Sequence, residues 1–68
     1  MMNKGDRVEI VNGVLRGEKA TVEQVGTAMN GWNGFVFIHF DKDGAHEPSK
    51  GQAILSPQWM EMSRLKVV

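Results

Sequence analysis

Residues 5–25 read GDRVEIVNGVLRGEKATVEQV, and this stretch decides the fold of the chain. Its first half alternates, so that Val8 and Ile10 lie on one side of an extended segment and the charged residues between them lie on the other. Asn12-Gly13 is a strong turn signal, because both residue types tolerate a positive φ. Alternation resumes over residues 19–25. Two short strands with a compact connection are typical of the first corner of a small β-barrel.

The rest of the chain adds further β signals and almost no helix. The segment FVFIHF, residues 35–40, is the most strongly β-forming part, and Ser56-Pro57 is typical of the start of a helical turn, which we predict near residues 57–62. The predicted strands cover residues 7–11, 19–25, 35–40, 52–55 and 65–68. We therefore predict an all-β fold, a small five-stranded barrel with one short helical turn before the last strand, formed by residues 1–68 as a single domain. The inward positions of the strands predict a core that includes Val8, Ile10, Ala20, Val22, Ile54, Leu65 and Val67.

Composition narrows the classes of function. The 68 residues contain eight basic and eight acidic side chains, so the formal net charge is zero, whereas strong binders of nucleic acid usually carry a basic excess. There is no cysteine, which excludes disulfides, thiol nucleophiles and cysteine-based zinc sites. No apolar run approaches the roughly 18 residues of a membrane-spanning helix, and a secretory leader is not evident. We expect a cytoplasmic protein that does not insert into membranes.

The aromatic residues are the main candidates for a binding site. Trp32 stands in the polar, glycine-rich loop 26–34, where it either caps an open end of the barrel or anchors a partner. Strand 35–40 is apolar on both faces, and a barrel needs only one of them, so either Phe35 and Phe37 with His39, or the alternate set, faces outward. Trp59 lies in the predicted helical turn, and the sequence leaves two alternatives for it, a core residue or an interface residue.

Basic residues of the first two strands complete the candidate partner-binding set. We expect Arg16 and Lys19 to flank Trp32 at the barrel end formed by loop 26–34. With Phe35, Phe37 and Trp59 they make up the predicted partner surface. The first and last strands of such a barrel lie close together, which predicts a mildly basic face opposite an acidic one.

The first third of the chain resembles the KOW motif, which occurs in SH3-like barrels of ribosomal proteins and transcription elongation factors. The matching positions are Gly5, Asp6, Val8, Ile10, Gly13, Gly17, Ala20 and Val22. The motif usually has a glycine before its final valine, where this chain has Ala20-Thr21-Val22. The resemblance implies an SH3-like barrel that contacts RNA or protein through loops at its ends. It indicates the fold more strongly than the ligand, because one fold serves many functions.

A second likeness is to the type II dihydrofolate reductases, which are SH3-like chains that assemble as tetramers around a central pore. The shared start is Gly5-Asp6-Arg7-Val8, and residues 51–57, GQAILSP, resemble the Val-Gln-Ile-Tyr-Pro signature of that family. The chain has no tyrosine, and an extra residue separates Gln52 from Ile54. The likeness implies an oligomeric enzyme that binds folate and NADPH.

No set of side chains forms a recognisable catalytic or metal-binding motif. Asp41, Asp43, His46 and Glu47 lie close in the sequence, but with the spacing of an ordinary solvated turn. We therefore expect no metal and no cofactor. The favoured hypothesis is a non-catalytic binding or adaptor module that docks a protein partner or associates with itself through exposed aromatic residues. An RNA-binding module and an oligomeric reductase remain the first and second alternatives.

Overall fold

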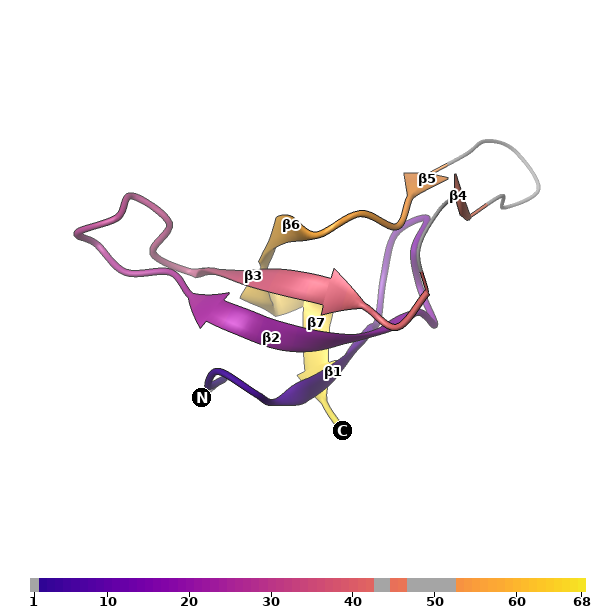
Figure 1. Ribbon diagram of the computed structural model, residues 1–68, viewed down its shortest axis with the longest axis horizontal. Helices are drawn as coiled ribbons and strands as arrows, with labels where there is room; N and C mark the ends of the chain where they lie inside the picture. The colour runs from indigo at the N-terminus through magenta and orange to yellow at the C-terminus, as the bar shows by residue number, and fades with distance from the viewer. Residues whose placement is uncertain (1, 43–44, 47–52) are drawn as a thin grey trace.

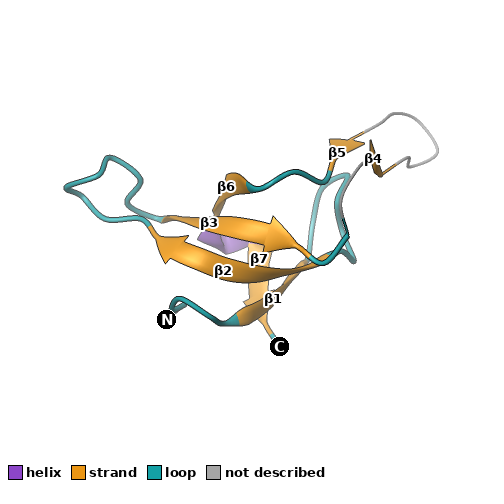
Figure 2. Cartoon of the chain, in the orientation of Figure 1, coloured by secondary structure: helices purple, strands orange, loops and turns teal. Residues whose placement is uncertain are grey.

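The computed structural model describes residues 2–42, 45–46 and 53–68, and within them the regular secondary structure is almost entirely β (Figures 1 and 2). Five antiparallel strands form one sheet in the order β6-β3-β2-β1-β7, and β4 pairs with β5 in a separate two-stranded sheet. The elements are β1 (Arg7–Ile10), β2 (Lys19–Val25), β3 (Phe35–Phe40), β4 (Ala45–His46), β5 (Ala53–Ile54), β6 (Gln58–Glu61), the 3₁₀ turn η1 (Met62–Arg64) and β7 (Leu65–Val67). The predicted all-β fold is confirmed, as is a single short helical turn directly before the last strand. No helix in these ranges is long and apolar enough to span a membrane.

The order of the strands shows that the sheet curls. β6 and β7 are its two edges, and in a flat sheet four strand spacings of about 4.8 Å would hold them about 19 Å apart. The chain connects them through the three residues of η1, which at about 2 Å per residue span only about 6 Å. The two edges must therefore approach each other, and the sheet wraps around its inner face.

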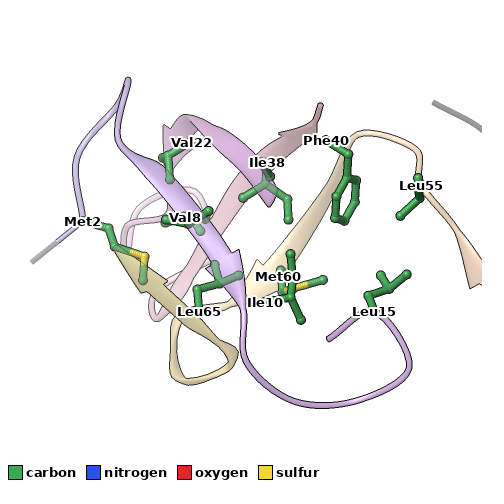
Figure 3. Close-up of a cluster of buried hydrophobic side chains, with 12 residues drawn as sticks. Met2, Val8, Ile10, Leu15, Val22, Ile38, Phe40, Leu55, Met60 and Leu65 are labelled. Atoms are coloured by element: carbon green, nitrogen blue, oxygen red, sulfur yellow. The ribbon is translucent and has the colours of Figure 1, made fainter. Parts of the chain in front are cut away.

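The inner face carries the core, which Figure 3 shows as one cluster of side chains from β1, β2, β3, β6 and β7 together with residues of the connections. The predicted inward residues Val8, Ile10, Ala20, Val22 and Leu65 are confirmed as buried. The predicted burial of Val67 is wrong. This residue pairs with Val8, but it lies on an edge strand and is 48% exposed. The side chain of Ile54 lies outside the described residues. Among the residues whose burial the structure describes, the buried cluster is Met2, Val8, Ile10, Leu15, Ala20, Val22, Val36, Ile38, Phe40, Leu55, Met60 and Leu65.

The predicted helical turn near residues 57–62 is wrong in its position. Residues 58–61 form β6, which pairs along β3, and the helical turn begins only at Met62. Ser56-Pro57 carries a local helix-start signal, but pairing with β3 outweighs it, because a strand here buries Met60 in the core. The predicted fourth strand, residues 52–55, is represented by β5, which pairs with β4 and does not join the main sheet.

A β-bulge in β2 changes which side chains face outward. Val22 pairs with Ile38 and Gln24 pairs with Phe37, so Glu23 is an extra residue on β2. As a result Glu23 and Gln24 are both exposed, while Val25 returns inward and packs against the core. The bulge thus places a carboxylate and an amide next to Phe37 on the outer face.

Candidate functional site

The two faces of β3 differ in composition and in burial. Val36, Ile38 and Phe40 point inward and are buried, which settles the question of which face is outside. Phe35 and Phe37 point outward and are half-buried, and His39 on the same face is exposed. Strand β3 lies between β2 and β6 in the sheet, so its outer residues have neighbours on both sides. The outer face of β3 is therefore the centre of the candidate site.

Four aromatic side chains gather on this outer face and form what we call the aromatic patch: Trp32, Phe35, Phe37 and Trp59. Trp32 and Trp59 stack with their rings nearly parallel, at 4° and a centroid distance of 4.8 Å. Phe35 meets Trp32 edge-on at 5.6 Å, and Phe37 meets Trp59 edge-on at 5.4 Å. The chain has three phenylalanines, two tryptophans and no tyrosine, so all its aromatic residues except the core residue Phe40 lie in the patch.

Pairing between β3 and β6 brings Trp59 to the patch. Phe37 and Trp59 are direct cross-strand partners, and the next inward pair is Val36 with Met60. Trp59 lies on the outer face, so the alternative that it is a core residue is excluded. Met60, the next residue on β6, lies in the core. Cross-strand aromatic pairs of this kind contribute to sheet stability as well as to surface chemistry.

Hydrogen bonds within loop 26–34 hold Trp32 in its place in the patch. The Thr27 N–H donates to Asn30 Oδ1 at 2.9 Å, and the Asn30 N–H donates to Thr27 Oγ1 at 3.2 Å. Asn30 Oδ1 also accepts from the Trp32 N–H at 2.9 Å, and the Trp32 carbonyl accepts from the Phe35 N–H at 2.9 Å. Trp32 neither caps the core nor stands apart from the barrel: it packs on the outer face and remains 40% exposed.

Gly26 permits this loop conformation. A Cβ atom at this position would lie 1.8 Å from the carbonyl oxygen of Trp32 and 2.7 Å from that of Phe35. No larger residue fits there without a shift of the backbone that carries Trp32. The glycine therefore sets how closely the loop approaches the end of β2.

Two exposed carboxylates adjoin the patch through the strand register, and we call Glu23 and Glu61 the acidic rim. Glu61 is the cross-strand partner of Phe35, and Glu23 is the bulge residue beside Gln24, the partner of Phe37. Both side chains are exposed. Glu23 Oε2 lies 3.7 Å from His39 Nδ1, a contact that is an ion pair only when the imidazole is protonated.

An open depression adjoins the patch on the side of β2. It has a volume of about 540 Å³ and is bounded by Phe37 together with Lys4, Gly5, Thr21, Val22, Glu23 and Gln24. The turn at Lys4-Gly5 forms its N-terminal border, where the Gly5 N–H donates to the Val22 carbonyl at 2.7 Å. The depression thus combines an aromatic ring, a carboxylate, an ammonium group, a hydroxyl and an amide within one concave surface.

Arg16 and Lys19 do not flank Trp32, contrary to the prediction. Lys19 begins β2 and loop 26–34 follows its last residue, so the two are separated by the length of a seven-residue strand, about 20 Å. Figure 1 shows loop 26–34 and the connection that contains Arg16 at opposite ends of β2. Lys19 instead lines a smaller depression of about 180 Å³ beside Asp41. Four of the six predicted partner-binding residues therefore come together, and these two do not.

An ion pair between Arg7 and Asp41 lies on the outer face near Lys19. Arg7 Nη1 and Nη2 each donate to one carboxylate oxygen of Asp41 at 2.6 Å, and Nη1 also donates to Thr21 Oγ1 at 2.9 Å. Hydrogen bonding from Arg7 lowers the pKa of the Asp41 carboxyl from its ordinary value. Both side chains are nearly half-exposed, so solvent screens the pair. This part of the face presents a satisfied ion pair rather than open apolar surface.

The described residues contain no group of three or more histidine, cysteine, aspartate or glutamate side chains that could hold a metal ion. Of the acidic turn considered above, Asp41 is bound to Arg7, while Asp43, Glu47 and the side chain of His46 lie outside the described residues. Gly51 and Gln52, which carry part of the likeness to the type II reductases, also lie outside them. The geometry that remains is that of a contact surface: stacked rings, an acidic rim and an adjoining depression.

Comparison of the chain with protein-family models, with curated proteins and with solved structures finds no match, so the resemblance to KOW-type SH3-like barrels stays a prediction.

Proposed function

We propose that this chain is a non-catalytic binding module that docks a protein partner on the aromatic patch. The observation that carries the proposal is the position of four of its five aromatic side chains outside a core that is already filled by aliphatic residues, Met and Phe40. Half-exposed tryptophan and phenylalanine rings are the residue types that dominate binding energy at protein interfaces. The absence of cysteine fits a cytoplasmic setting.

The order of loop 26–34 supports a docking role for Trp32. The hydrogen bonds of Asn30 and Thr27 hold the loop, and stacking on Trp59 fixes the indole, before any partner arrives. A side chain held in this way loses little rotamer freedom on binding, which leaves more of the contact energy for affinity. The patch therefore has the properties of a preformed anchor.

The charge around the patch favours protein over nucleic acid. Exposed rings would stack with unpaired bases, which is the feature that keeps an RNA-binding module as the alternative. The phosphates of RNA would, however, approach Glu23 and Glu61, and the net charge of the chain is zero. A protein partner is compatible with the acidic rim, because it can place basic residues opposite the two carboxylates.

A selection from a random peptide display library, made with the whole chain as bait, tests the proposal. We expect enrichment of peptides whose binding weakens by about 2 kcal/mol or more when Trp32 is replaced by alanine. Met29→Ala is the matched control, because Met29 lies in the same loop and is 98% exposed without a ring contact. Binding should be unchanged in this control.

Four outcomes would overturn the proposal. Peptides that bind equally well to wild type and to Trp32→Ala would place the interface elsewhere. Retention of a single-stranded RNA oligonucleotide at low salt, lost in Trp32→Ala, would establish the RNA alternative. A dimer or tetramer in light scattering that a charge at Phe37 converts to monomers would show that a second copy of the chain covers the patch. A rise in melting temperature with folate and NADPH would support the reductase alternative instead.

A further inference from the structure

Charge is distributed unevenly over the outer face of the sheet. The basic residues Arg7, Lys19 and Lys66 lie on β1, the start of β2 and β7. Glu9 pairs in register with both Lys19 and Lys66, and Arg7 is bound to Asp41. This half of the face therefore carries its positive charges together with acidic neighbours, and it contains none of the patch residues.

The aromatic half of the same face carries carboxylates. Within residues 2–42, 45–46 and 53–68, Glu61 has no ion-pair partner, and Glu23 has only His39. Both carboxylates are exposed and adjoin the patch through the register of β3 with its neighbours. Lys4 is the basic residue that lines the depression beside Phe37. The charge that a partner meets on the rings is thus mainly negative.

Aromatic faces and carboxylates attract the same chemical group. A guanidinium or ammonium ion is drawn to the face of tryptophan, most strongly of all aromatic side chains, and to a carboxylate as an ion pair. The depression adds the Thr21 hydroxyl and the Gln24 amide, whose oxygens accept further N–H groups, and it is open to the patch through Phe37. These groups together match the chemistry of a long cationic side chain.

We infer that the docked protein segment presents an arginine or lysine side chain to the aromatic patch beside Glu23 and Glu61. The inference rests on the proposed docking function and adds the chemical class of its partner. A second copy of this chain fits less well, because apposing two patches would bring the acidic rims together. A polyanion fits less well for the same reason.

The experiment titrates the whole chain with three short peptides while tryptophan fluorescence is followed. The first alternates leucine and arginine, and the other two carry glutamine or glutamate in place of each arginine. We expect the arginine peptide to bind about fivefold to tenfold more tightly than the glutamine peptide, from the sum of one cation–π contact and one exposed ion pair. The glutamate peptide should bind least.

Charge variants of the protein locate the effect. The double variant Glu23→Gln with Glu61→Gln should remove most of the preference for arginine, and Lys4→Ala should strengthen binding of the arginine peptide. Glu9→Gln is the matched control, because it removes the same charge from the other half of the outer face. Its binding should equal that of wild type. Melting curves of all variants show that each remains folded.

Equal binding of the arginine and glutamine peptides would overturn the inference, and so would a preference that survives in the double variant. Either result leaves the docking function intact if peptides selected from the library still require Trp32. Loss of any dependence on Trp32 would instead remove the docking function and the inference with it. The two failures are therefore distinguishable.

Discussion

Neighbouring residues on β3 occupy two different environments, and the contrast shows how this small chain divides its apolar side chains. On the inner face Val36, Ile38 and Phe40 are buried among aliphatic side chains from all five strands of the main sheet (Figure 3). On the outer face Phe35 and Phe37 are half-buried and meet the partly exposed rings of Trp32 and Trp59. A curled sheet needs one buried face to fold.

The difference indicates which residues serve the fold and which are available for binding. A chain of this length buries only about 60% of its unfolded surface, so it has little apolar surface to spare. Placing four of five aromatic residues outside the core is costly for solubility unless something uses them. The inner face therefore accounts for folding, and the outer face is the surface that we propose for docking.

The strongest test of this contrast compares Ile38→Ala with Phe37→Ala, at adjacent positions on opposite faces. Ile38 is fully buried, so its truncation should lower the free energy of unfolding by about 2–5 kcal/mol. Phe37→Ala should cost about 1 kcal/mol, since its ring is half-buried and pairs edge-on with Trp59. Urea unfolding measures both. Equal losses would mean that the outer face is a second core.

Gly26→Ala should disturb the outer face through the backbone. The added Cβ would collide with the Trp32 carbonyl oxygen, and moving the loop should cost about 1–3 kcal/mol. Because the loop carries Trp32, its stacking on Trp59 should also weaken, which circular dichroism detects as loss of the coupling between the two indoles. An unchanged spectrum in Gly26→Ala would show that the loop does not determine the stack.

Trp32→Ala should have a smaller effect on stability. Trp32 is stacked on Trp59 but 40% exposed, so we expect a loss of about 1 kcal/mol, the size of an aromatic pair. A buried tryptophan would cost about 3–5 kcal/mol. A loss in that higher range, measured against Met29→Ala in the same loop, would identify Trp32 as a structural residue.

The Arg7–Asp41 pair should contribute the least, and its effect should depend on pH. The pKa of Asp41 is lower in the folded chain than in the unfolded one, so the pair stabilises fully above the unfolded value of about 3.9 and loses its effect as pH falls through the folded value. The melting temperature of wild type should therefore fall more steeply than that of Asp41→Asn below about pH 4. Parallel curves would show that the pair has no role in stability.

Much of the fold could be predicted from local patterns. The strands at residues 7–10 and 19–25 follow directly from alternating side chains, and β3 follows from its β-branched and aromatic residues. β6 could not be recognised in this way, because Ser56-Pro57 imitates a helix start and only pairing with β3 reveals the strand. Leu15 was missed because it lies in a connection, yet it is buried in the core.

The site was predictable as a set of residues and less so as an arrangement. Phe35 and Phe37 stood out because strand 35–40 is apolar on both faces, and Trp32 stood out because its loop is polar and rich in glycine. The sequence left open which face of the strand is outward and whether Trp59 lies in the core. Their contact depends on the register of β3 with β6 and on the path of loop 26–34, neither of which is a local property.

The misplacement of Lys19 has a simpler cause. Lys19 opens the strand that ends where loop 26–34 begins, so strand length alone separates it from Trp32. Arg16 lies in the connection that leads into Lys19, and Figure 1 shows this connection at the same end of β2. Residue type suggested a role for these two side chains, and the geometry of an extended strand argues against it.

The most direct test of the account is nuclear magnetic resonance mapping of a selected peptide on the labelled protein. We predict that the largest chemical-shift changes fall on the indole N–H groups of Trp32 and Trp59 and on the amides of Phe35 and Phe37, while Arg16, Lys19 and the core residue Val8 change little. Changes centred on Arg16 and Lys19, with both indole signals unmoved, would contradict the claim that the aromatic patch is the docking surface.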